Sequence, residues 1–219
     1  EKAFDKGLRD AVSVPEHLWL ADGTALLLDA RVPKESRTLE LLVPATASRR
    51  PACDSGKALA SLRELLGPDS EELPESLEWP ENVSPDGRQA VYVLDRDIFV
   101  LDLAASRFRR LTYNAEEEKN PSFAPDGAQL SFVRDNDLFV MDMRSGKDRR
   151  LTRDGSETLL NGTLSWVYWE EIFGREDTAA WWSPDSQAIA FLQSDESGVG
   201  ESVFVDFEPT TPKVEHQRY

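Results

Sequence analysis

Residues 124–152 read APDGAQLSFVRDNDLFVMDMRSGKDRRLT, and residues 84–112 read SPDGRQAVYVLDRDIFVLDLAASRFRRLT. The two stretches align without a gap at a separation of forty positions, and each has a Pro-Asp-Gly turn, an Asp-x-Asp turn and an Arg-Arg-Leu-Thr end. A period near forty, with several short strands per unit, is typical of β-propeller blades. The sequence therefore predicts an all-β propeller segment.

Each forty-residue unit divides into four short strands. In the second copy we expect one strand to end near Phe123, two more to cover 129–133 and 137–141, and the last to cover 149–152. Asp-Gly supplies the positive φ that a tight hairpin needs, and the flanking β-branched and aromatic residues suit a half-buried sheet. The units are therefore predicted to be four-stranded blades.

Two weaker copies flank the clear ones, at 17–23 and at 181–186. The last copy begins 59 residues after the preceding one, where forty are expected, so the chain carries an extra segment there. A helix is expected at 57–66, ended by Gly67 and Pro68. We therefore predict a partial ring of about four four-stranded blades, at approximately 15–50, 80–119, 120–160 and 178–219, with insertions at approximately 54–78 and 161–177.

The composition excludes several classes of partner. The chain has 41 acidic and 25 basic residues and a net charge of −16, with no run of Lys or Arg that could follow phosphates or anionic lipid. Binding to nucleic acid or to a membrane is therefore not expected. The single cysteine, Cys53, cannot form an internal disulfide and suits a small buried side chain.

The extra segment begins NGTLSWVYWEEIF at 161–173 and places two adjacent carboxylates, Glu170 and Glu171, among aromatic residues. A carboxylate next to apolar surface needs a partner. That partner is either an internal Arg or Lys or a cationic group of a ligand, and the spacing alone favours the internal partner. The aromatic residues are Trp166, Tyr168, Trp169 and Phe173.

The same segment, followed by AWWSP at 180–184, closely resembles the propeller of the dipeptidyl peptidase IV family, within the prolyl oligopeptidase superfamily. The family pattern is Asn-Gly-Ile-Thr-Asp-Trp-Val-Tyr-Glu-Glu-Glu-Val-Phe, and the first Glu of its triplet is Trp169 here. The resemblance extends over about 84–219. It implies that Glu170 and Glu171 hold the free N-terminal amine of a peptide substrate. Trp166, Tyr168 and Phe173 are then the expected supporting residues.

The resemblance also implies an activity that lies partly outside this chain. Members of the family release N-terminal dipeptides, Xaa-Pro or Xaa-Ala, through a Ser, an Asp and a His in an α/β-hydrolase domain. No Gly-x-Ser-x-Gly occurs in the chain, and its histidines, His17 and His216, have no catalytic context. We therefore expect no catalytic residue here, no activity of the chain alone, and no cofactor or metal.

Several partners follow from this interpretation: peptides with a free N-terminus, the missing hydrolase domain, the remaining blades, and a second copy of the chain. The family favours the periplasm or secretion, while the composition is equally compatible with the cytoplasm. The alternative function is a non-catalytic propeller module that binds another protein.

The family also uses an arginine from another propeller loop to hold the substrate carbonyl, and Arg134, Arg144 and Arg175 are candidates. The Asp-x-Asp pairs at 95–97 and 135–137 have a spacing that could suggest calcium ligands. Their place between two strands favours instead turn residues whose side chains accept hydrogen bonds from the nearby backbone.

Two further local predictions concern an acidic run and a tryptophan pair. The run at 116–118 is interpreted as a solvated loop, and Trp181 and Trp182 as strand core, with the alternative that one of the two rings reaches the central channel.

Overall fold

The structure is a computed structural model that describes residues 14–67, 70, 73–174, 176–206 and 212–218. Three four-stranded antiparallel sheets follow one another along the chain, each with its strands in sequence order. The first contains β1 (Glu16–Trp19), β2 (Ala25–Leu28), β3 (Glu40–Val43) and β4 (Ser48–Pro51). The second contains β5 (Asn82–Val83), β6 (Gln89–Leu94), β7 (Asp97–Asp102) and β8 (Arg107–Arg110). The third contains β9 (Glu118–Phe123), β10 (Gln129–Arg134), β11 (Asp137–Asp142) and β12 (Asp148–Arg150).

The second and third sheets repeat each other in register as well as in sequence. Val91 on β6 lies opposite Val100 on β7, and forty positions later Ser131 on β10 lies opposite Val140 on β11. The turns repeat too, because Asp95 and Arg96, like Asp135 and Asn136, all have positive φ. Two consecutive residues with positive φ form the turn whose twist matches a two-residue hairpin. The predicted propeller fold is confirmed in these two units.

A helix covers the first two sheets. Helix α2 (Ser55–Leu66) begins at the end of the first sheet, where the Asp54 side chain accepts a hydrogen bond from the backbone N–H of Lys57 at 3.0 Å. Its buried face includes Ala58 and Leu62 and packs against β8. This helix lies within the predicted insertion and extends two residues further toward the N-terminus than expected. Two short 3-10 helices, η1 (Lys34–Ser36) and η2 (Pro44–Thr46), flank β3.

The core lies between successive sheets. One buried cluster joins the first sheet, α2 and the second sheet, with Leu26, Leu62 and Phe99 completely buried. Another joins the second and third sheets through Ile98 and Phe132. Each such side chain contributes about 1.5–3 kcal/mol by leaving water. The sheets are therefore held to one another by apolar side chains that point from their strands into the clusters between successive sheets.

The last unit is built differently from the first three. It contains β13 (Leu159–Asn161), α3 (Trp166–Glu171), β14 (Ala180–Trp182), β15 (Ile189–Phe191) and β16 (Gln193–Asp195). Strand β15 pairs with β14 and β16 pairs with β13, while Leu192 between them donates to the Ala179 carbonyl at 2.9 Å. Residues 189–195 therefore follow one path whose two halves pair with different strands. A separate hairpin of β17 (Glu201–Asp206) and β18 (Lys213–Arg218) follows.

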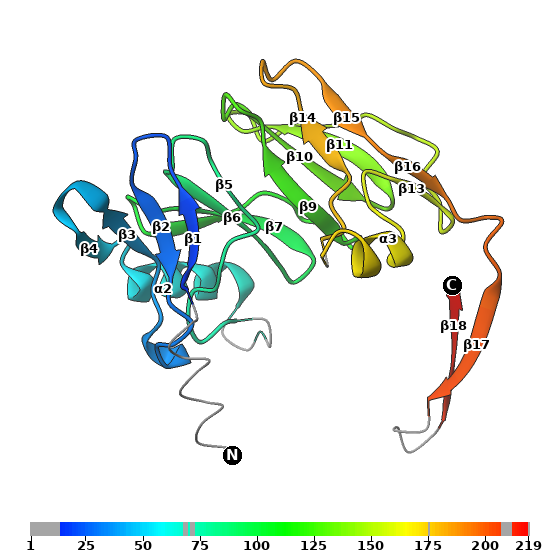
Figure 1. The fold of residues 1–219 in the computed structure, drawn as a ribbon, viewed down its shortest axis with the longest axis horizontal. Coiled ribbons are helices and arrows are strands. Elements are labelled where there is room, and N and C mark those ends of the chain that lie inside the picture. Colours follow the sequence, from blue (N-terminus) through cyan, green and yellow to red (C-terminus); the bar gives the residue numbers. More distant parts are fainter. Residues whose placement is uncertain (1–13, 68–69, 71–72, 175, 207–211, 219) are drawn as a thin grey trace.

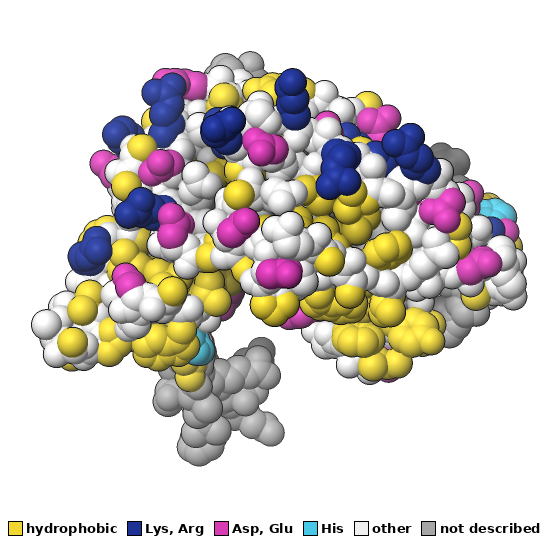
Figure 2. All heavy atoms as spheres, turned by 90° about the horizontal axis from the view of Figure 1, so that it is seen from above, with side chains coloured by type: hydrophobic (Ala, Val, Ile, Leu, Met, Phe, Trp, Pro, Cys, Tyr) yellow, Lys and Arg dark blue, Asp and Glu magenta, His cyan; other side chains and the backbone are white. Residues whose placement is uncertain are grey.

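The sheets succeed one another along an arc, with α2 and α3 on its lower side and the β17–β18 hairpin at the far end (Figure 1). Seen from above, Lys, Arg, Asp and Glu side chains are interspersed over much of the surface, and hydrophobic side chains gather along one side (Figure 2). Within the described ranges, no helix has the length and apolar character needed to cross a membrane.

The structure corrects the interpretation of the acidic run. Glu118 is fully buried at the start of β9, where its carboxylate accepts hydrogen bonds from Arg134, Thr112 and Asn114 at 2.7, 2.7 and 2.9 Å. The local sequence hid this because the partners come from the neighbouring β10 and from the end of the preceding unit. Glu118 is therefore an internal ion-pair residue, and not part of a solvated loop.

The Asp-x-Asp pairs also differ from expectation in one respect. The first Asp of each pair lies in the turn, but the second, Asp97 or Asp137, is completely buried. Asp97 on β7 accepts from Arg110 on the neighbouring β8, and Asp137 on β11 accepts from Arg150 on the neighbouring β12. The second Asp is thus an internal anchor that the second and third units share. Among the described residues, no group of His, Cys, Asp and Glu is placed to hold a metal ion.

Candidate functional site

The extra segment leaves the sheet as a loop that is closed at its base. Thr163 and Thr178 form an isolated antiparallel bridge. Beside it the backbone N–H of Leu164 donates to the Asp177 carbonyl at 2.8 Å, and that of Ala179 donates to Gly162 at 3.0 Å. We call residues 162–178 the excursion. Because its two ends are hydrogen-bonded to each other, the excursion projects from a fixed position on the sheet.

Asn161 anchors the start of the excursion and is completely buried. Its Nδ2 donates to the Asn136 carbonyl, to Asp137 Oδ1 and to Asp154 Oδ1 at 3.2, 3.2 and 3.1 Å. Its Oδ1 accepts from Gln193 Nε2 at 2.8 Å. Buried amides are stable only when both ends have partners, and Asn161 satisfies this with groups from the third sheet and from β16.

Helix α3 forms the outer part of the excursion and is only six residues long. A helix this short has little stability of its own, so its position depends on the closed base and on packing of its aromatic side chains. The rings of Trp166 and Trp169 meet edge to face, with centroids 6.5 Å apart. The other aromatic residues of the segment, Tyr168 and Phe173, are about half exposed, at 51% and 45%.

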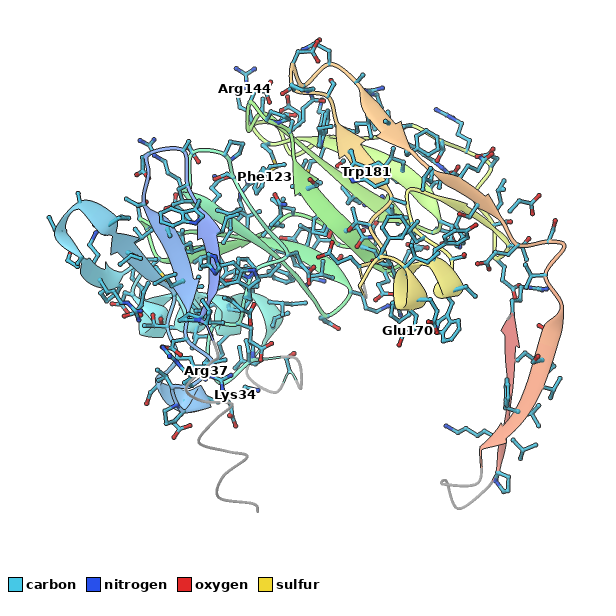
Figure 3. All side chains as sticks on the ribbon, viewed as in Figure 1. Lys34, Arg37, Phe123, Arg144, Glu170 and Trp181 are labelled. Carbon is cyan, nitrogen blue, oxygen red and sulfur yellow. The ribbon has the colours of Figure 1, made fainter. Side chains whose placement is uncertain are left out.

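The two predicted carboxylates end this helix. Glu170 is half-buried and Glu171 is exposed, and both lie in the last turn, where there is no basic residue. The backbone carbonyls at a helix C-terminus carry partial negative charge, which adds to that of the carboxylates. Glu170 lies on the lower side of α3, away from the sheets above it (Figure 3). The end of α3 is therefore an electronegative, solvent-accessible position.

The predicted supporting residues are divided between two cavities. Trp166 and Tyr168 line one of about 490 Å³, together with Leu192 and Gln193 on the strand path of the last unit. Phe173 lines the other, of about 660 Å³, together with Trp181. The structure therefore places Trp166 and Tyr168 on one cavity and Phe173, just beyond the end of α3, on another.

The structure separates the three candidate arginines. Arg134 donates to Glu118 at 2.7 Å and to Asp148 at 3.0 Å, and its guanidinium lies 4.7 Å from the centre of the Phe139 ring, so it is an internal residue. Arg144 lies at the upper end of the third sheet, far from the lower side where Glu170 lies (Figure 3). Arg175 lies outside the described residues.

One feature of this region was missed in the sequence, and one was misassigned. Trp182 donates its indole N–H to the Ser122 carbonyl at 3.1 Å and is partly buried, but Trp181 is 47% exposed and borders the larger cavity. The interpretation of Trp181 as strand core is therefore wrong. The missed feature is Asn120, whose side chain lines the same cavity. The sequence does not indicate this position, because it depends on an irregularity in the pairing of β9.

Comparison with known families gives one matching model, described as the dipeptidyl peptidase IV N-terminal region, over residues 114–219. Dipeptidyl aminopeptidase B of Saccharomyces cerevisiae is 56% identical over 50 residues, which are 23% of this chain and 6% of that protein. A probable dipeptidyl-aminopeptidase B of Talaromyces stipitatus is 49% identical over 49 residues, which are 22% of this chain and 5% of that protein. The chain thus matches only a small part of these relatives.

Solved structures share the fold. Dipeptidyl peptidase 4 of Porphyromonas gingivalis superposes with a TM-score of 0.69 at 21% identity, over all of this chain and 31% of that one. A putative dipeptidyl aminopeptidase IV from Bacteroides ovatus gives 0.55 at 17% identity, over 95% of this chain and 27% of that one. These structures show the shared fold, while the family resemblance seen in the sequence is confirmed by the family model over residues 114–219 and by the short matches to the dipeptidyl aminopeptidases.

Proposed function

We propose that this chain, whose residues 114–219 carry the N-terminal region of the dipeptidyl peptidase IV family, is the substrate-gating part of a serine exopeptidase. In this proposal Glu170 and Glu171 hold the N-terminal amine of a peptide. The observation that supports it is the place of these two carboxylates, at the end of a helix on an excursion that is closed at its base.

The chemistry of the helix end suits an ammonium group. A primary ammonium has three N–H donors and no acceptor, and two carboxylates can accept them in charge-assisted hydrogen bonds. The carbonyls at the end of α3 add negative potential, and the nearby rings exclude part of the water that would screen it. A neutral or acylated N-terminus offers neither the charge nor the donors.

A fixed grip on the amine would also set the length of the product. If the amine is held at a constant distance from the nucleophile, only a set number of residues fits before the scissile bond. The family name and the names of the relatives point to dipeptides. The Ser, Asp and His of the hydrolytic step belong, in this proposal, to an α/β-hydrolase domain of the parent enzyme.

The proposal is tested by Glu170→Gln and Glu171→Gln in the full-length enzyme. We expect each substitution to weaken binding of the transition state of a free-amine dipeptide substrate by ~2 to 4 kcal/mol. This corresponds to a decrease in kcat/KM of roughly 30- to 1,000-fold. The Gln side chain keeps the shape of Glu but removes its charge. Glu157→Gln, an exposed site outside the excursion, is the matched control and should leave kcat/KM unchanged.

Substrate chemistry provides an internal check. Nα-acetylated substrates lack the ammonium, so their slow hydrolysis should be insensitive to both Gln variants. Wild-type kinetics on the free-amine substrate in both variants would refute the amine-binding role.

A further inference from the structure

The larger cavity, of about 660 Å³, lies where three consecutive units approach one another. Its walls come from the segment before β5, from β9, and from the end of the excursion up to β14. This volume is in the range of pockets that hold small organic groups. Glu170 and Glu171 are not among the residues that line it.

Aromatic side chains form part of the wall. Trp79, Phe173 and Trp181 come from three separate segments and all line the cavity. Phe173 and Trp181 are 45% and 47% exposed, so a large part of each side chain is accessible and does not pack in the core. Exposed faces of Trp and Phe attract organic cations through the ring quadrupole, and Trp does so most strongly.

Carboxylates form another part of the wall. Glu81, Glu176 and Asp177 line the cavity, and among the described residues none of the three carboxylates has an ion-pair or hydrogen-bond partner. Removal of water around Glu81 raises the pKa of its carboxyl, and the negative charge of Asp177 raises it further. Within the part of the chain that the structure describes, these are neighbouring acids with no cation paired to them, an arrangement that a positive ligand would stabilise.

The side-chain amide of Asn120, a partly buried residue, also lines the cavity. On β9, Lys119 lies opposite Val133 and Ser122 opposite Ser131, so Asn120 and Pro121 together face a single residue of β10. Such a bulge redirects a side chain. The Asn120 Nδ2 atom is buried and has no acceptor in the part of the chain that the structure describes. A buried N–H donor without an acceptor costs about 1–3 kcal/mol, which a ligand carbonyl would recover.

We propose that this cavity binds the cationic side chain of a peptide, a guanidinium or ammonium, between Glu81 and Asp177 and against Trp79 and Trp181, with Asn120 donating to a carbonyl of that peptide. The acidic wall repels phosphates and carboxylates. The carboxylates are not grouped closely enough, among the described residues, to hold a metal ion, which favours an extended organic cation. The proposal goes beyond the amine-binding role of Glu170 and Glu171 and does not depend on it.

The probe is Nα-acetyl-L-arginine amide, which carries the guanidinium and two carbonyls but no free amine for Glu170 and Glu171. Its binding to the full chain is followed by tryptophan fluorescence and by the side-chain amide resonance of Asn120. Nα-acetyl-L-citrulline amide, the neutral isostere, is the matched ligand and should bind at least about tenfold more weakly, because it lacks the charge.

Variants assign the binding to this cavity. We expect the double variant Glu81→Gln, Asp177→Asn to raise the Kd for the arginine probe about tenfold or more, and Trp181→Leu to raise it about two- to fivefold. Glu157→Gln removes one charge elsewhere and should leave the Kd unchanged. Thermal unfolding shows that each variant is folded, and Glu81→Gln alone replaces the double variant if that one is not.

Three results would overturn the proposal: equal binding of the citrulline and arginine probes, an unchanged Kd in the cavity variants, or an equal loss in Glu157→Gln. The last result would mean general attraction to an acidic protein. A free-amine dipeptide amide without a basic side chain separates the two proposals, since its binding should depend on Glu170 and Glu171 and not on Glu81.

Discussion

Asp137 shows how one buried residue can hold a blade together. Its carboxylate is fully buried and accepts hydrogen bonds from Arg150, from the Thr152 hydroxyl and from the Gly155 N–H. Burial alone would raise the pKa of Asp137, but these hydrogen bonds outweigh it, and the pKa lies below the ordinary value of 3.8. Asp97 repeats the arrangement with Arg110 forty positions earlier.

The lowered pKa of Asp137 predicts a pH dependence of stability. A carboxyl with a lower pKa in the folded than in the unfolded state adds stability that is fully present above about pH 4 and is lost as the pH falls through the folded pKa. The free energy of unfolding of the wild-type chain should therefore fall more steeply below pH 4 than that of Asp137→Asn. Urea unfolding of both proteins between about pH 2.5 and 6, in steps of about half a pH unit, measures this difference in the free energy of unfolding. Parallel curves for the two proteins would contradict the role of the carboxylate.

Gly155 allows the backbone to pass close to Asn136. A Cβ at this position would lie 2.5 Å from the Asn136 carbonyl oxygen and 2.8 Å from the Asp137 carboxyl carbon. Gly155→Ala should therefore destabilise the chain by about 1–3 kcal/mol, because backbone must shift to admit the methyl group. Gly56→Ala is the control: the nearest atom to a Cβ there is Asp54 Oδ1 at 3.5 Å, an ordinary contact, and Ala should stabilise α2 by about 0.5–1 kcal/mol. Thermal unfolding of both variants separates crowding from a general effect of replacing glycine.

At the scale of the element, the excursion is the part of the fold on which the proposed site depends. Asn161 links it to the Asp137 cluster of the third sheet and to Gln193 on β16. The position of α3 is thus tied to the two sheet segments on either side of it. Any change that loosens this link should move Glu170 and Glu171 without touching them.

Asn161→Ala tests this link. The substitution removes the amide that satisfies Asp154, Gln193 and the Asn136 carbonyl, which should cost about 1–3 kcal/mol. Hydrogen exchange should show a loss of protection at the N–H groups of Leu164 and Ala179, which close the base of the excursion. Protection of Val100 in the second sheet should change little. Uniform loss of protection across all sheets would mean that Asn161 stabilises the whole chain instead of the excursion.

The elements differ in how far the sequence predicts them. The strands of the second and third sheets follow from the forty-residue repeat, because each turn carries its own Asp-Gly or Asp-x-Asp signal. Helix α3 was not predicted, since six residues of mixed aromatic and acidic character show no helical periodicity, and its N-cap residue, Ser165, makes no side-chain capping hydrogen bond. The pairing of 189–195 with two different strands was also hidden, because it depends on where the excursion returns to the sheet.

The candidate site was predicted only in part, for the same physical reason. Glu170 and Glu171 are adjacent in sequence, so their aromatic context is visible without a structure. The larger cavity is lined by Glu81, Asn120 and Asp177. Successive members of this set are more than thirty positions apart in the sequence, and they come together only through the packing of three units. The buried state of Glu118 shows the converse case, where a local acidic run concealed a long-range ion pair.

At the scale of the whole molecule, the arc leaves apolar surface uncovered. Within the described residues, Phe191 and Leu192 are 37% and 44% exposed on the strand path of the last unit, and Val203 and Phe204 are 59% and 51% exposed on the β17–β18 hairpin. A two-stranded hairpin is marginally stable by itself, and blades of an open ring need a neighbour to cover their faces. We therefore expect the chain, expressed alone, to cover this surface by self-association.

Sedimentation velocity over a range of protein concentrations measures this association. The wild-type chain should show a concentration-dependent increase in sedimentation coefficient, and Phe191→Ser with Leu192→Ser should shift it toward the monomer, because the replacement removes apolar area that association would bury. Tyr113→Ser changes an even more exposed aromatic residue, 71% accessible, on the connection between β8 and β9, and should leave the distribution unchanged. A wild-type chain that stays monomeric at all concentrations and unfolds cooperatively would show instead that the open arc is stable without a partner. In that case the exposed residues of the last unit need no cover, and the sheets' internal clusters carry the stability of the fold alone.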